Sequence, residues 1–173
     1  MAEKNLDFDT VIDRTHTNSL KYDFAVQRGK PKDVLPLWVA DMDFQVSSYI
    51  QEALSGSVAH GIFGYSEAEG SYFEAVAGWM SRHYGWNVEE TWLVKTPGIV
   101  FALAQAVRAF TEPGDAVLLQ QPVYYPFSQV IRDNGRKIVD NTLVQGEDGR
   151  YRIDFTDFEE KIRSAHVKLF FLC

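Results

Sequence analysis

The sequence of 173 residues contains a single cysteine, Cys173, and therefore cannot form a disulfide within the chain. Such a shortage of cysteine is typical of proteins in a reducing compartment, so we expect a cytoplasmic protein. The four histidines stand alone in the sequence, and it contains neither a C-x-x-C nor an H-E-x-x-H motif. We therefore expect no metal site.

Long apolar runs and an excess of positive charge are also missing. The longest apolar run covers residues 99–104, whereas a helix that crosses a membrane needs roughly 20 apolar residues. The 24 acidic side chains outnumber the 17 basic ones and give a formal charge of −7. Surfaces that bind nucleic acid are instead rich in lysine and arginine. We expect neither a membrane nor nucleic acid as a partner.

Apolar residues make up 46% of the chain, which is enough for the core of a globular domain. Their spacing predicts strands that alternate with helices, and this order is typical of an α/β fold with a mostly parallel sheet. The predicted helices cover residues 47–59, 66–84, 100–110, 125–134 and 155–164, and the predicted strands cover residues 92–96, 116–121, 137–141 and 167–172. Residues 1–46 show no sustained periodicity and are predicted to form an extended arm with a short strand-like stretch at 35–39.

Capping and turn residues support these boundaries. Ser66 and Glu69 form a capping-box pattern before the second helix, and Gly85 is placed to end it. Pro113 and Gly114 predict a tight turn, since proline presets its own φ and glycine tolerates a positive one.

Two loops that follow strands are candidate binding sites. The loop at Gly98 opens into a helix, so free backbone N–H groups and the helix dipole suit a phosphate, although an ordinary turn fits the same pattern. An aromatic cluster around Tyr124 follows the next strand, where a ring could stack on a flat ligand or pack under the sheet. Ligands in such sheets bind beyond the carboxyl ends of strands, so the two loops could converge. No dinucleotide, P-loop or hydrolase motif is present.

Four motifs, at residues 37–44, 60–65, 112–115 and 122–124, make the sequence resemble the class I/II aminotransferases. More narrowly, it resembles their cystathionine β-lyase (C–S lyase) branch, which depends on pyridoxal phosphate. The resemblance implies a three-layer αβα large domain with a mostly parallel sheet, here incomplete and preceded by an N-terminal arm. It divides the chain into an arm at 1–46 and the N-terminal part of the cofactor-binding domain at 47–173.

The resemblance also implies roles in cofactor binding. Gly98, Ile99 and Val100 match the phosphate cradle of the family, and Tyr124 matches the aromatic residue that stacks on the pyridine ring. Tyr65 matches a tyrosine that reaches the phosphate in the neighbouring subunit, which implies a homodimer with shared sites. Packing at the entry of a helix is the alternative role for Tyr65.

Residues Val39, Ala40 and Asp41 match the segment whose backbone lies beside the carboxylate of an amino-acid substrate. Many aminotransferases have glycine where this chain has Ala40, so the departure favours a lyase. The alternative for Asp41 and Asp43 is a solvated pair of charges.

The resemblance implies that the catalytic residues of the family are absent from this chain. In the family, a lysine forms a Schiff base with the cofactor and a carboxylate pairs with the pyridine nitrogen, and both follow an Asn-Pro motif expected just after Cys173. Lys95 lies nearest the cradle but matches no family role. We expect the N-terminal half of a C–S lyase that is inactive in isolation. An aminotransferase and a non-catalytic truncated module are the alternatives.

Overall fold

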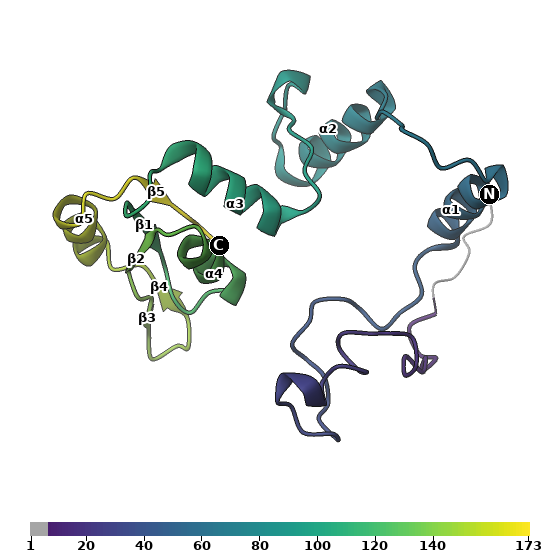
Figure 1. The fold of residues 1–173 in the computed structure, drawn as a ribbon, viewed down its shortest axis with the longest axis horizontal. Helices are drawn as coiled ribbons and strands as arrows, with labels where there is room; N and C mark the ends of the chain where they lie inside the picture. The colour runs from purple at the N-terminus through teal and green to yellow at the C-terminus, as the bar shows by residue number, and fades with distance from the viewer. Residues whose placement is uncertain (1–6) are drawn as a thin grey trace. The chain divides into compact units, whose positions relative to one another are not determined.

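The computed structural model describes residues 7–173 and separates two compact units, with the boundary between Glu67 and Ala68. In the N-terminal unit, the 3-10 helix η1 (Val26–Arg28) precedes helix α1 (Ser48–His60) (Figure 1). Ser47 caps α1 by accepting the N–H of Tyr49, and Gly61 ends the helix in a left-handed conformation with φ of 72°. The predicted first helix is thus confirmed.

The C-terminal unit contains the remaining helices and strands of the described chain. In chain order they are α2 (Gly70–Tyr84), the 3-10 helix η2 (Glu90–Trp92), α3 (Ile99–Phe110), β1 (Ala116–Leu119), α4 (Tyr125–Asp133), β2 (Lys137–Asp140), β3 (Val144–Gln145), β4 (Tyr151–Arg152), α5 (Phe155–Ser164) and β5 (Leu169–Phe170).

Strands β2, β1 and β5 form a parallel sheet in that spatial order, so the predicted parallel sheet is confirmed. All four residues of the central strand β1 are buried, which explains why its sequence is continuously apolar. Strands β3 and β4 form a separate antiparallel hairpin. The sequence did not predict these two short strands.

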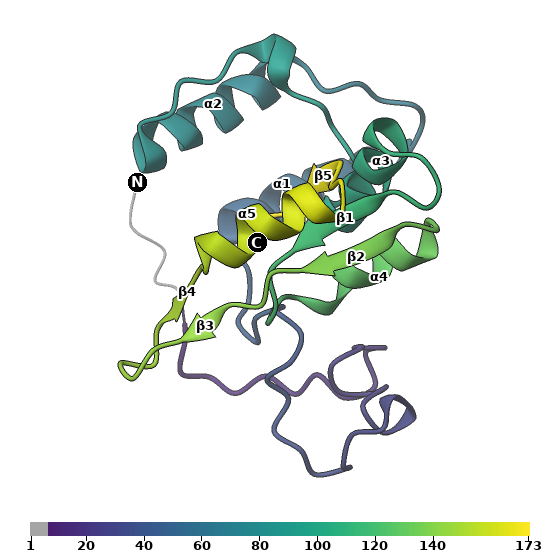
Figure 2. The same ribbon diagram turned by 90° about the vertical axis from the view of Figure 1, so that its left-hand side faces the viewer.

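Helices α4 and α5 lie on opposite faces of the sheet, as expected for an αβα arrangement (Figure 2). Successive side chains of a strand point to opposite faces. The ring of Phe171 contacts Phe127 in α4, at 6.0 Å between centroids, whereas Phe170 contacts Phe158 in α5 at 5.1 Å. Helices α4 and α5 therefore cover opposite faces, and α3 packs beside α4.

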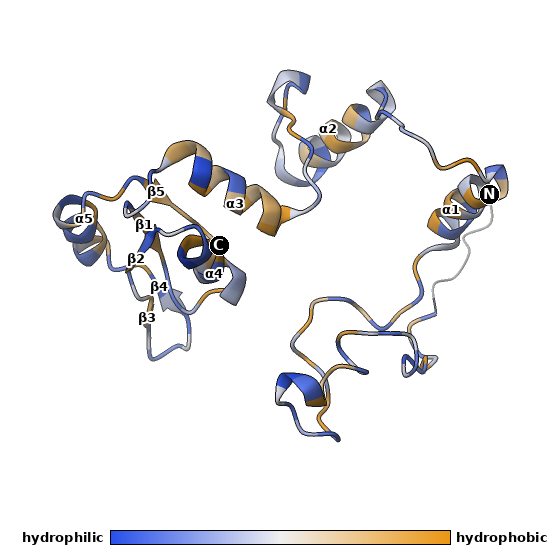
Figure 3. Cartoon of the chain, viewed as in Figure 1, coloured by the Kyte–Doolittle hydropathy of each residue, from blue (hydrophilic) through white to orange (hydrophobic). Residues whose placement is uncertain are grey.

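The main core lies between the sheet and the helices α3 and α4. Val107 of α3, Val117 and Leu119 of β1, and Ile131 of α4 are completely buried in it. Helix α3 is apolar over most of its length, which Figure 3 shows in orange, and this composition suits a helix that supports a core. The predicted turn follows α3 directly: the N–H of Asp115 donates to the carbonyl of Glu112 at 3.0 Å, and Gly114 has φ of 90°.

Three local predictions were wrong. Residues 92–96 form no strand: Trp92 ends η2, and residues 93–96 follow it without regular structure. Residues 35–39 form no strand either, and neither segment has a partner strand among residues 7–173. The capping box at Ser66 does not form, since α2 begins only at Gly70 and Glu69 occupies the capping position. The part of the arm at residues 1–6 lies outside the described residues.

None of the helices within residues 7–173 combines the length and the apolar character that crossing a membrane requires.

Candidate functional site

The N-terminus of α3 presents free backbone donors. Gly98 precedes the helix, and its carbonyl accepts the N–H of Ala102 at 3.0 Å and the hydroxyl of Thr96 at 3.2 Å. No side chain caps the helix, and within residues 7–173 the N–H groups of Ile99 and Val100 have no acceptor. A Cβ added at Gly98 would meet no atom within 4 Å, so the backbone there is open to approach. These donors and the helix dipole suit an anion.

Tyr124 lies at the N-terminus of α4, and its side chain is 56% exposed. Its ring meets the ring of Tyr125 edge-to-face, at 5.2 Å between centroids. The alternative that Tyr124 packs under the sheet is therefore wrong. An exposed aromatic face can stack on a flat ligand.

A buried polar network holds the loop that leads to Tyr124. Asn141 is completely buried and its carbonyl oxygen accepts the side-chain amide of Gln120 at 2.7 Å. The amide of Asn141 donates to the carbonyl of Asp154 at 3.1 Å and to the carboxylate of Asp157 at 2.7 Å. We call Gln120, Asn141, Asp154 and Asp157 the asparagine network. It ties the end of β1 to the start of α5.

The free donors and Tyr124 face the same edge of the sheet. A short turn joins α3 to β1, and Leu103 and Val107 pack on the core, so α3 runs back along β1. The N-terminus of α3 therefore lies towards the edge where β1 ends, and α4 begins at that edge. The carboxyl edge of a parallel sheet is the usual place for a ligand.

The other predicted site residues belong to the N-terminal unit. Tyr65 lies in the segment between α1 and α2 and is fully exposed, so it does not pack at the entry of a helix. Val39 is half-buried, whereas Ala40 and Asp41 are exposed.

Ion pairs engage Asp41 and Asp43, so the alternative of two merely solvated charges is wrong. One guanidinium nitrogen of Arg14 lies 2.5 Å from a carboxylate oxygen of Asp41, and another lies 2.6 Å from Asp43. The ammonium of Lys21 lies 3.0 Å from Asp43 and also donates to the backbone carbonyl of Asp41 at 3.0 Å. We call these four residues the arm cluster.

Electrostatics within the arm cluster favour its charged state. Arg14, and next Lys21, lower the pKa of Asp43 to about 2. The pKa of Tyr22 is raised, first by desolvation and then by its hydrogen bond to Asp43. The arm cluster was missed from the sequence, because its cations and carboxylates are separated by 20 or more residues without any periodic pattern.

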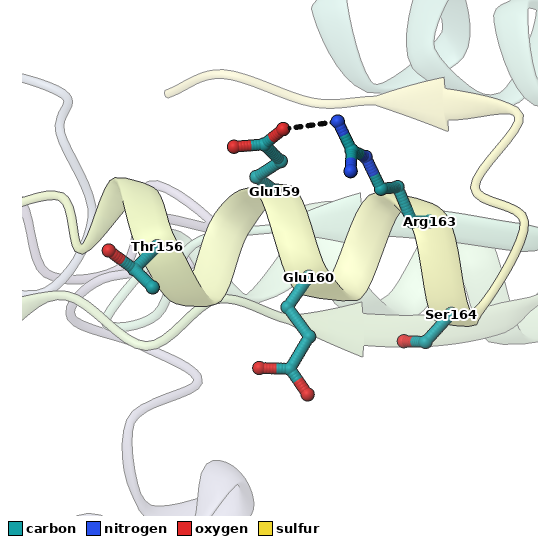
Figure 4. Close-up of a pocket in the computed structure, with 5 residues that line it drawn as sticks. All are labelled: Thr156, Glu159, Glu160, Arg163 and Ser164. Carbon is teal, nitrogen blue, oxygen red and sulfur yellow. Dashed lines mark hydrogen bonds and ion pairs between the residues drawn. The ribbon is translucent and has the colours of Figure 1, made fainter.

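A hollow on α5 is too open and too weakly built to serve as a site. Thr156, Glu159, Glu160, Arg163 and Ser164 line it, and Figure 4 shows these side chains spread along the outside of one helix. Its one ion pair, Glu159 with Arg163 at 2.5 Å, is a helical pair between exposed side chains. Within residues 7–173 there is also no group of acidic, histidine or cysteine side chains that could hold a metal.

Comparison with known proteins finds relatives that match nearly the whole chain. Cystathionine beta-lyase PatB of Bacillus subtilis is 45% identical over 97% of this chain and 43% of its own length. A C–S lyase of Staphylococcus hominis, solved with pyridoxal phosphate and the inhibitor L-cycloserine, matches with a TM-score of 0.87 and 31% identity, over 95% of this chain and 42% of that one. A pyridoxal-phosphate-bound candidate aminotransferase of Clostridium difficile 630 matches with a TM-score of 0.91 and 34% identity, over 98% of this chain and 43% of that one.

The chain thus spans less than half the length of these relatives. The family model of the class I and II aminotransferases matches residues 32–173. Because this match extends over most of the sequence, the chain belongs to the class I and II aminotransferase family.

Proposed function

We propose that the chain is the N-terminal part of a pyridoxal-phosphate-dependent C–S lyase, which breaks a carbon–sulfur bond in an amino acid. The observation that carries the proposal is the free N–H groups at Ile99 and Val100 and the exposed ring of Tyr124 at one edge of the sheet. These groups fit the phosphate and the flat ring of the cofactor. The similarity to PatB supports the reaction.

Each of these residues would make a separate contact. The N–H groups of Ile99 and Val100 would donate to phosphate oxygens, and Gly98 would let the phosphate approach the backbone closely. The ring of Tyr124 would lie on the pyridine ring and keep water from that face. Val39, Ala40 and Asp41 would orient the carboxylate of the substrate through their backbone.

Pyridoxal phosphate, when joined to an amino acid, supplies an electron sink that acidifies the proton on the α-carbon. In the proposed elimination this proton is removed and the bond between the β-carbon and sulfur breaks. The sulfur leaves as a thiol, and water converts the remaining fragment to pyruvate and ammonia. Lys95 is the lysine closest in sequence to the cradle, and its ammonium lies 5.9 Å from the ring of Tyr72. From the family resemblance, we expect a lysine outside these 173 residues to move the proton.

An aminotransferase is the second candidate, and the match to the Clostridium difficile structure supports it. Ala40, where many aminotransferases have glycine, favours the lyase.

We also propose a homodimer in which Tyr65 reaches the cofactor phosphate of the partner subunit, and the full exposure of Tyr65 is compatible with that role. Residues 1–46 would act as an arm and residues 47–173 as part of the cofactor-binding domain. The free Cys173 is compatible with a reducing cytoplasm.

The decisive experiment uses the complete protein that contains this chain. Purified with pyridoxal phosphate and given cystathionine, it should release homocysteine, pyruvate and ammonia in equal amounts. Exchange of amino groups with a keto acid, without thiol release, would replace the lyase with an aminotransferase. Absence of both reactions and of cofactor binding would overturn the proposal.

The isolated chain provides a second test. Mixed with pyridoxal phosphate and reduced with borohydride, it should give no stoichiometric adduct on one defined lysine and no turnover of cystathionine. A stoichiometric adduct together with turnover would show that the chain carries its own catalytic lysine.

A further inference from the structure

Asp41 and Asp43 of the arm cluster lie in a segment, residues 35–46, that makes few other contacts. Within the described chain, residues 35–46 take part in no backbone–backbone hydrogen bond. Besides the arm cluster, the side-chain contacts of this segment include an edge-to-face contact between Phe8 and Phe44, at 5.1 Å between centroids, and a cation–π contact between Lys30 and Trp38 at 5.8 Å. An extended segment without ladder bonds depends on side-chain contacts for its position.

The turn between Arg14 and Lys21 is itself well ordered by hydrogen bonds. The carboxylate of Asp23 accepts the backbone N–H groups of His16, Thr17 and Ser19 at 2.9 to 3.1 Å. This turn brings Arg14 and Lys21 to one side of the chain. Lys21 is only 6% exposed, so its ammonium relies on the arm cluster for hydrogen-bond acceptors.

The contacts in the arm cluster also determine the backbone at Asp41. The guanidinium of Arg14 spans two carboxylates that are two residues apart, which holds their side chains on one side of the segment. Lys21 binds the backbone carbonyl of Asp41 directly. A planar guanidinium can bridge two carboxylates in this way, whereas the point charge of a lysine cannot reproduce the fork.

We infer that Arg14 and Lys21 are positioning residues for substrate binding, which act through Asp41 and Asp43 to hold the backbone of residues 39–41. The inference rests on the proposed function, in which this segment orients the substrate carboxylate. Neither residue takes part in the chemistry. Replacing either residue weakens substrate binding and leaves cofactor binding and kcat almost unaltered.

Backbone nitrogen-15 NMR relaxation of the 173-residue chain tests the structural half of the inference. In Arg14→Met, which keeps much of the side-chain volume, the order parameters of residues 37–44 should fall from about 0.8 to below about 0.6. Arg28→Met is the matched control, because Arg28 is exposed in the same unit and within residues 7–173 its side chain makes no ion pair. It should leave the order parameters unchanged. Equal order parameters in both variants would overturn the inference.

Kinetics of the complete protein test the functional half. Arg14→Met should raise KM for cystathionine about tenfold, with kcat within about twofold and the cofactor absorbance unchanged. Arg14→Lys should restore part of the loss, and Asp43→Asn, a smaller change, should act in the same direction if Arg14→Met does not fold. An unchanged KM would overturn the inference. Absence of activity in the unaltered protein would instead refute the proposed function, while the relaxation result would still report on the arm cluster.

Discussion

Replacing Asn141 by alanine should destabilise the chain through the asparagine network. Asn141 is completely buried, and the substitution removes its hydrogen bonds to the amide of Gln120 and to the carbonyl of Asp154. Each such bond contributes about 1 kcal/mol net, and Gln120, which is 7% exposed, would be left with an unpaired amide at a further cost of about 1 kcal/mol. The sum predicts a loss of about 3 kcal/mol. The bond to Asp157 is left out of this sum, because that carboxylate is partly exposed and keeps Lys161 at 2.8 Å.

Urea unfolding of the 173-residue chain, followed by far-ultraviolet circular dichroism, measures this loss. Asn87→Ala is the matched control, since Asn87 is exposed and the same atoms are removed. It should change the free energy of unfolding by less than about 0.5 kcal/mol. If Asn141→Ala cost less than about 1 kcal/mol, or no more than the control, the network would not stabilise the loop and the reasoning would be refuted.

Two further predictions concern the two candidate binding segments. Because Arg14 and Lys21 lower the pKa of Asp43 from 3.8 to about 2, the folded chain binds fewer protons there than the unfolded chain, so the contribution of Asp43 to stability is present above pH 4 and is lost between pH 4 and 2. A carboxyl carbon NMR titration should give a midpoint near 2 that moves towards 3.8 in Arg14→Met, and an unmoved midpoint would contradict the ion pairs. In the complete protein, Tyr124→Leu should weaken pyridoxal phosphate binding about fivefold in an absorbance titration, while Tyr124→Phe and the control Tyr151→Leu stay within about twofold. Equal weakening by the leucine and phenylalanine variants would show that the hydroxyl, not the ring, makes the contact.

Apart from the start of α2, helix ends and tight turns were predictable because their causes are local in the sequence. Asp154 accepts the N–H groups of Thr156 and Asp157, and α5 begins where that capping residue predicts. Gly85 and Gly114 adopt the positive φ values for which glycine was expected. Pro126 occupies the first turn of α4, where its missing N–H costs nothing.

Strands were less predictable, because a strand requires a partner that the local sequence does not identify. The apolar residues of β1 find β2 and β5 on either side and are buried. Residues 92–96 also begin with three apolar residues, but they have no partner strand within residues 7–173 and do not form a strand. In the same way, α1 forms as its spacing predicts, yet its apolar residues Leu54 and Val58 are 61% and 68% exposed. Periodicity predicts which face is apolar and does not predict what covers it.

The polar contacts of the candidate site were also not predictable from the local sequence. The motifs predict Tyr124 and Asp41 as site residues, but the groups that hold their segments are Asn141 and Arg14, which lie 17 and 27 residues away in the sequence. Both segments lie outside helices and strands, so neither the 3.6-residue nor the 2-residue period constrains them. Side-chain hydrogen bonds and ion pairs hold these two segments in place, as backbone hydrogen bonds do within helices and strands. A binding segment can therefore be predicted from its own residues, whereas its shape depends on polar partners that only the folded structure reveals.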